Sequence, residues 1–164
     1  IITARALIGF KSEFLTNTRG SGLMHHSFHG YIPKVKGERS RQKGVLIAME
    51  SGLTTAYAME STQERGQLFV GTNTPVYAGM VVGESARDTS LVVNPCKKKA
   101  LTNMRASGSD DAAILTPARI LSLEQCIEFI ETDELVEVTP KNLRIRKKFL
   151  DPTARKRSEQ ASGR

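Results

Sequence analysis

The chain has 164 residues, of which 39% are hydrophobic, 25% charged and 5% aromatic. No apolar run approaches the ~18 residues that a membrane-spanning helix needs, so we expect no membrane segment. The formal net charge of +7 and the pI of about 9.6 favour a polyanionic partner, either nucleic acid or an anionic membrane surface. The first two residues, Ile-Ile, do not resemble a signal peptide, and we interpret the sequence as a fragment of a longer chain.

The first part of the sequence predicts a helix followed by a strand. Apolar residues recur at helical spacing over residues 3–18, and Arg19-Gly20 supplies a stop. Residues 22–33 alternate as a strand does and end at a proline. One helix and one strand cannot bury their own apolar faces, so residues before Ile1 should complete this unit. The polar, basic stretch 34–43 predicts a linker and a domain boundary.

Short strands separated by turns are predicted from Gly44 onwards. Residues 44–50 and 53–59 should form strands joined by a two-residue hairpin connection at Ser51-Gly52. A short helix is expected around residues 61–66, and further strands are expected at 67–71, 76–84 and 90–95. Many short strands in succession favour a small antiparallel barrel or sandwich.

Residues 94–112, NPCKKKALTNMRASGSDDA, form a cationic stretch with no acidic residue before Asp110. Apolar residues are isolated in it and no periodicity survives, so it predicts a flexible arm between the strand 90–95 and a strand at 112–117. Such an arm can reach phosphate groups and should become ordered only when bound. The alternative is a solvated loop without a partner, which is the common case for a single charge run.

The C-terminal third predicts a capped helix, two strands and a final helix. Ser122 and Gln125 form a capping box, and Asp151-Pro152 begins the last helix. In the second strand, residues 142–150, alternation puts a basic set on the face opposite Leu143, Ile145 and Lys147. That set is Arg144, Arg146 and Lys148. It can lie along a phosphate backbone, or it can serve to protect a sheet edge, and the two readings are equally supported.

No motif for catalysis occurs in the sequence. It contains no GxxxxGK[ST] loop, GxGxxG, GxSxG or HExxH, so we expect no catalytic residue. His25 and His29 would lie about 13 Å apart on one strand face, too far to bind one ion, and His26 would face away, so we expect no metal site. Cys96 and Cys126 lack metal-site spacing and predict reduced cytosolic thiols.

Particular strings resemble a known family over essentially the whole chain. ARALIGFKSEFLTNTRGSG, QERGQLFVG, VYAGMVVG, VNPCKKKALTNMRASGSDDA and SLEQCIEFIETDELVEVTPKNLRIRKKFL are similar to the C-terminal part of BipA/TypA translational GTPases. The resemblance implies an α+β fold. It also implies that residues 1–35 are the second half of a ferredoxin-like domain shared with elongation factor G. Residues 36–164 would be the mostly antiparallel, barrel-like C-terminal domain with a mobile loop at 94–112.

The same resemblance implies a function. The parent protein would be a cytoplasmic, monomeric GTPase that acts in large-subunit assembly and stress adaptation, with GTP and Mg²⁺ in a G domain that this chain lacks. No catalytic residue or cofactor is therefore expected here, and the chain alone should not bind nucleotide. The loop would contact ribosomal RNA and A-site tRNA, and the matching positions are Lys97, Lys98, Lys99, Thr102, Asn103, Arg105 and Ser107.

An alternative uses the acidic helix rather than the loop. Glu124, Glu128 and Glu131 could dock a basic ribosomal protein, although a lone charged helix face is more often simply solvated.

Overall fold

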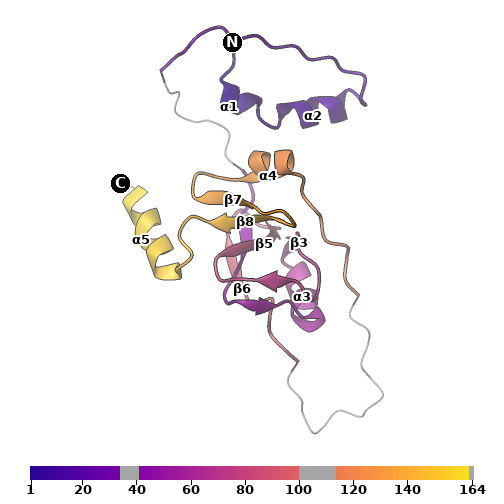
Figure 1. The fold of residues 1–164 in the computed structure, drawn as a ribbon, viewed down its shortest axis with the longest axis vertical. Helices are drawn as coiled ribbons and strands as arrows, with labels where there is room; N and C mark the ends of the chain where they lie inside the picture. The colour runs from indigo at the N-terminus through magenta and orange to yellow at the C-terminus, as the bar shows by residue number, and fades with distance from the viewer. Residues whose placement is uncertain (34–40, 100–113, 163–164) are drawn as a thin grey trace.

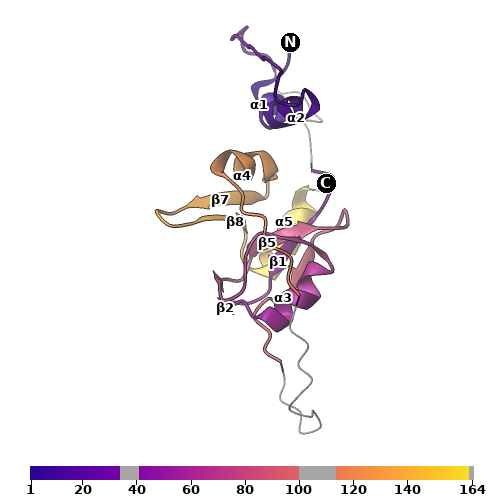
Figure 2. The same cartoon turned by 90° about the vertical axis from the view of Figure 1, so that its right-hand side faces the viewer.

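The computed structural model describes residues 1–33, 41–99 and 114–162 (Figures 1 and 2). Two short helices, α1 (Ala4–Leu7) and α2 (Phe10–Asn17), replace the single predicted helix. The break falls at Gly9, whose φ of 83° lies in the left-handed region that glycine adopts without steric cost. The predicted stop is confirmed, because Arg19 and Gly20 both have positive φ, at 51° and 81°.

The strand predicted at residues 22–33 is wrong. A strand needs a neighbour that accepts and donates its backbone hydrogen bonds, and no described segment pairs with these residues. The side chains of Leu23 and Phe28 are 81% and 77% exposed, so no core holds the segment either. The separation of ~13 Å between His25 and His29 assumed a strand, and that argument falls with it. Among the described residues, no three His, Cys, Asp or Glu side chains lie close enough to hold a metal ion.

One open, mostly antiparallel sheet forms the centre of the rest of the described chain, with the order β6-β1-β5-β8-β7 and with β3 also paired to β5. Only the β1–β6 pair is parallel among the pairs described. A separate ladder joins β2 to β4. The predicted α+β class is confirmed, and the described strands form an open sheet rather than a closed barrel. The strands are β1 (Val45–Ala48), β2 (Gly52–Leu53), β3 (Gly66–Leu68), β4 (Pro75–Val76), β5 (Met80–Ser85), β6 (Leu91–Val93), β7 (Glu134–Val138) and β8 (Leu143–Lys147).

Both faces of this sheet are buried, which explains the continuous apolar run of β1. Leu46 and Ala48 belong to a core that includes Met59 of the helix α3 (Ala56–Gln63). Val45 and Ile47 belong to a second core that includes Cys126 of the helix α4 (Leu123–Phe129). Successive residues of a strand point to opposite faces, so the two helices cover the sheet from opposite sides.

Two predictions between residues 51 and 66 are wrong. No hairpin forms at Ser51-Gly52, because β1 pairs with β5 and β6, whereas β2 pairs with β4. Residues 56–59 belong to α3 instead of a strand. Thr55 caps this helix through its side chain, which accepts a hydrogen bond from the Ala58 amide at 3.2 Å. Helix formation wins because it buries Ala58, Met59 and Thr62 on one face.

The C-terminal predictions are confirmed. Ser122 and Gln125 form the capping box of α4, with hydrogen bonds of 3.3 and 3.0 Å. Strands β7 and β8 form an antiparallel hairpin, and α5 (Pro152–Ser162) follows with the Asp151 carboxylate capping the Ala154 amide at 2.8 Å. In the described part of the chain, no helix combines the length and apolarity that crossing a membrane requires. The linker at 34–43 lies mostly outside the described residues, and the division into two domains stays a prediction.

Candidate nucleic-acid interface

The first residues of the cationic loop, 94–99, are fixed where they leave the sheet, and we call them the outgoing leg. After β6, the Asn94 side chain accepts a hydrogen bond from the Cys96 amide at 3.0 Å, and Pro95 is buried. Thr55 then binds the leg twice, because its amide donates to the Pro95 carbonyl at 3.0 Å and its hydroxyl donates to the Lys97 carbonyl at 2.5 Å. The three lysines that follow are exposed: Lys97, Lys98 and Lys99.

The segment that returns from the loop, residues 114–119, is held at the other end of α3, and we call it the returning leg. The Gln63 side chain donates to the Ile114 carbonyl at 2.7 Å and accepts from the Thr116 amide at 3.0 Å. Further along, the Arg119 amide donates to the Leu68 carbonyl at 2.8 Å. The strand predicted at 112–117 is therefore wrong over its described part, where a glutamine side chain replaces a strand neighbour.

The two legs thus flank one short helix. Thr55 precedes α3 and Gln63 ends it, and eight helical residues span about 12 Å. Figure 1 shows the loop leaving the sheet on the side of α3. Four predicted contact residues of the loop lie outside the described residues: Thr102, Asn103, Arg105 and Ser107.

The predicted alternation of β8 is confirmed. Ile145 and Lys147 are buried at 4% and 6% exposure, whereas Arg144 and Arg146 are half-buried on the other face of the strand. Lys148 lies beyond the end of β8, is exposed, and has its ammonium group 5.9 Å from the centre of the Phe149 ring. The structure therefore brings two of the three predicted cations together.

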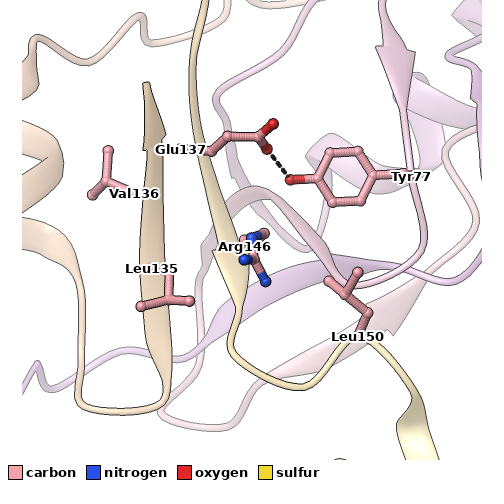
Figure 3. A pocket seen from close by; sticks show the side chains of 6 residues that line it. All are labelled: Tyr77, Leu135, Val136, Glu137, Arg146 and Leu150. Carbon is pink, nitrogen blue, oxygen red and sulfur yellow. Dashed lines mark hydrogen bonds between the residues drawn. The ribbon is translucent and has the colours of Figure 1, made fainter. Parts of the chain in front are cut away.

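These two arginines do not form a purely basic stripe, because an acid shares their face. Glu137 of β7 pairs with Arg144 in the sheet register. The Tyr77 hydroxyl donates to Glu137 Oε2 at 2.5 Å (Figure 3). Burial, together with the hydrogen bond and the charge of Glu137, raises the pKa of Tyr77, while the charges of Arg146 and Arg144 partly offset this. Tyr77 therefore stays protonated as a donor at neutral pH.

A hollow of about 460 Å³ opens beside this hydrogen bond (Figure 3). The sequence could not indicate it, because Tyr77 and Glu137 are 60 positions apart and meet only through the pairing of β5 with β8 and of β8 with β7. The lining residues come from the turn before β5, from both strands of the hairpin and from the segment before α5. They are Tyr77, Leu135, Val136, Glu137, Arg146 and Leu150.

Lys147 does not join the exposed cations because two acids hold it, the buried Glu134 and the exposed Asp133. Its ammonium lies 2.9 Å from Glu134 and 2.7 Å from Asp133. Glu134 also accepts two hydrogen bonds from the Arg41 guanidinium, each at 2.9 Å. The guanidinium carbon of Arg41 lies 4.3 Å from the centre of the Phe129 ring. We call Arg41, Asp133, Glu134 and Lys147 the buried ionic cluster.

Arg41 and its pairing with Glu134 were not predicted from the sequence. The signal was a lysine on the apolar face of a predicted strand, which requires a buried acid beside it.

The acidic residues in α4 and just after it do not present one uniform face. Glu124 is exposed, whereas the Glu131 carboxylate accepts a hydrogen bond from the Arg41 amide. Glu128 lies next to Gly9, the residue that separates the helices α1 and α2. A Cβ atom added at Gly9 would lie 2.5 Å from the Cδ atom of Glu128. The docking of a basic protein on this helix stays a prediction.

Both cysteines are free thiols, as the spacing predicted. Cys126 is buried and Cys96 is half-buried. Burial raises the pKa of both thiols, and the charge of Glu50 adds to this at Cys96.

Comparison with known proteins identifies the region that carries these features. The family model described as the TypA/BipA C-terminal domain matches residues 43–152. The chain is 48% identical over 163 residues to the large ribosomal subunit assembly factor BipA of Haemophilus influenzae, which covers 99% of this chain and 26% of the relative. It is 47% identical over 162 residues to the Escherichia coli K12 protein of the same name, and this alignment covers 98% of this chain and 27% of the relative. It is 43% identical over 158 residues to the protein of the same name from Bacillus subtilis, and this alignment covers 96% of this chain and 26% of the relative. The chain thus spans about a quarter of the length of these relatives.

Proposed function

Since the chain belongs to the TypA/BipA C-terminal domain family, we propose that it is the ribosome-binding module of a translational GTPase that assists assembly of the large ribosomal subunit. The relatives are named as large ribosomal subunit assembly factors, and they align with nearly all of this chain. GTP and Mg²⁺ would bind to residues outside this sequence, which contains no GxxxxGK[ST] loop. The chain contributes the contacts to ribosomal RNA and to A-site tRNA.

The observation that carries this proposal is the fixed base of the loop. Thr55 and Gln63 hold the two legs at opposite ends of α3, and the outgoing leg carries three consecutive exposed lysines. A rigid base sets the direction in which the loop leaves the sheet and reduces the conformational freedom lost on binding. Lysine side chains bind phosphate as point charges, which suits contact with an RNA backbone.

Binding of the chain to 50S particles as a function of salt tests the proposal. Each phosphate neutralised on a duplex contributes about −0.9 to the slope of log affinity against log salt, so three lysines account for a slope of about −2.7. Between 50 and 200 mM salt this amounts to roughly a 40-fold loss of affinity. The variant with Lys97, Lys98 and Lys99 changed to Ala should bind more weakly and lose that part of the slope.

A variant that removes three exposed charges elsewhere controls for net charge. Lys11, Lys43 and Lys156 are exposed and belong neither to the loop nor to α3, and changing all three to Ala should leave most of the slope in place. Equal slopes for the two triple variants would show that the loop makes no specific contact.

A further inference from the structure

The hollow on the β7–β8 hairpin exposes a carboxylate and a guanidinium that do not pair with each other. Glu137 accepts the Tyr77 hydroxyl through Oε2, and no ion pair joins Glu137 to Arg144 or Arg146 within the described residues. Arg146 donates Nη1 to the Lys147 carbonyl at 3.3 Å, so most of its five donors remain available. Figure 3 shows Glu137, Tyr77 and Arg146 directed into the same space.

Apolar side chains complete this hollow. Leu135 and Leu150 line it and are 39% and 40% exposed, so they present apolar surface that the described chain leaves uncovered. Its volume of about 460 Å³ lies within the range of ~300–1,000 Å³ that is usual for small-ligand sites. The hollow therefore fits a group with apolar surface, a hydrogen-bond donor edge and an adjacent negative charge.

We propose that this hollow binds an unpaired guanosine of RNA, with Glu137 accepting hydrogen bonds from the base edge and Arg144 and Arg146 binding the adjoining phosphate. Guanine presents two neighbouring donors, N1–H and the N2 amino group, which the two oxygens of one carboxylate can accept. Uracil and adenine offer a single donor group on that edge. The edge is accessible only in an unpaired nucleotide, which is how proteins read RNA sequence. The inference rests on the proposed function, because it takes ribosomal RNA or tRNA as the partner.

A basic side chain of a ribosomal protein could also donate to Glu137, but the charges around the hollow disfavour it. The Arg144 and Arg146 guanidinium groups lie close enough to lower the pKa of Tyr77, so they would repel a second cation placed beside Glu137. The same two groups attract phosphate. Electrostatic complementarity therefore favours a nucleotide over a cationic peptide.

Titration of the ¹⁵N-labelled full 164-residue chain, followed by NMR, tests the site with four probes. Guanosine monophosphate should shift the amides of β7, β8 and Tyr77 and bind about tenfold more tightly than cytidine monophosphate, since a two-bond base contact discriminates by roughly that factor. Inorganic phosphate should shift the arginine positions only. Equal binding of the two nucleotides would overturn the base contact. A single-stranded oligonucleotide with one guanosine should bind more tightly than the free nucleotide, and the reverse order would overturn RNA as the ligand.

Matched variants connect the effect to Glu137. Glu137→Gln keeps an acceptor for Tyr77 but supplies only one acceptor oxygen, so the guanosine preference should disappear while phosphate still binds. Glu124→Gln, an equal charge change on exposed α4, should keep the preference. If Glu137→Gln also keeps it, the site is refuted. Changing Lys97, Lys98 and Lys99 to Ala should weaken 50S binding without altering the preference, so the loop proposal and this one can fail separately.

Discussion

The substitution Glu134→Gln should cost more stability than any other single charge removal in the buried ionic cluster. The Glu134 side chain is fully buried, and it lies within 2.9 Å of both the Arg41 guanidinium and the Lys147 ammonium, whose side chains are 14% and 7% exposed. Removing one partner of a buried ion pair costs about 3–5 kcal/mol, because the remaining charge stays buried without compensation. Lys147 keeps Asp133 at 2.7 Å, so we expect a loss near the lower end, about 3 kcal/mol.

The stability lost in Glu134→Gln should depend on pH and should be largest at neutral pH. Burial alone would raise the pKa of Glu134, but the hydrogen bonds and charges of Arg41 and Lys147 outweigh burial and hold that pKa below its ordinary value. A carboxyl group whose pKa falls on folding stabilises the fold above its unfolded pKa, about 4.3 for Glu, and this stabilisation disappears as the pH falls through the lower folded value. The difference between the chain and Glu134→Gln should therefore be full at pH 7 and shrink below about pH 4.

Urea unfolding followed by circular dichroism at pH 7 and pH 3 measures this difference. Glu124→Gln, on the exposed surface of α4, is the matched control and should change the free energy of unfolding by less than about 0.5 kcal/mol. The reasoning is refuted if Glu134→Gln costs less than about 1 kcal/mol at pH 7, the value of a surface pair. An equal loss at both pH values would also refute it.

Two further substitutions test the packing of the hairpin and the loop base. Gly79→Ala should destabilise by at least about 1–2 kcal/mol in thermal unfolding, because φ is 85° and the new Cβ would lie 2.8 Å from the Leu150 Cα. Gly71→Ala, where the Cβ meets nothing within 4 Å, should not match that loss. Gln63→Ala removes the bonds that hold Ile114 and Thr116, so limited proteolysis should cut the returning leg faster with little change in melting temperature; unchanged cleavage would show that these bonds do not hold it.

Where local chemistry and tertiary packing agree, the sequence was sufficient. The capping box of α4 needs only Ser122 and Gln125, which lie three positions apart and bond to each other's backbone. The faces of β8 followed from alternation, because a buried residue at Ile145 requires Arg144 and Arg146 on the other side.

Elements whose identity depends on distant partners could not be predicted in the same way. Residues 53–59 alternate acceptably for a strand, yet burial of Met59 against the sheet selects a helix. Residues 22–33 alternate as well, but no described segment supplies hydrogen-bond partners. The buried ionic cluster and the hollow on the hairpin could not be predicted for the same reason. Arg41 and Glu134 are 93 positions apart in the sequence, and Tyr77 and Glu137 are 60 positions apart. Only the sheet order β5-β8-β7 brings the latter pair together.

The positions of the charges, more than their sum, determine how this chain can meet a polyanion. A strand with the sequence LRIRK offers three cations by count, but the pleat buries Lys147, which the buried Glu134 and the exposed Asp133 neutralise. Arg144 and Arg146 stay on the accessible face beside a carboxylate that they do not pair with. The hairpin is thus suited to recognising one nucleotide, whereas the consecutive lysines of the loop are suited to binding backbone phosphates regardless of sequence.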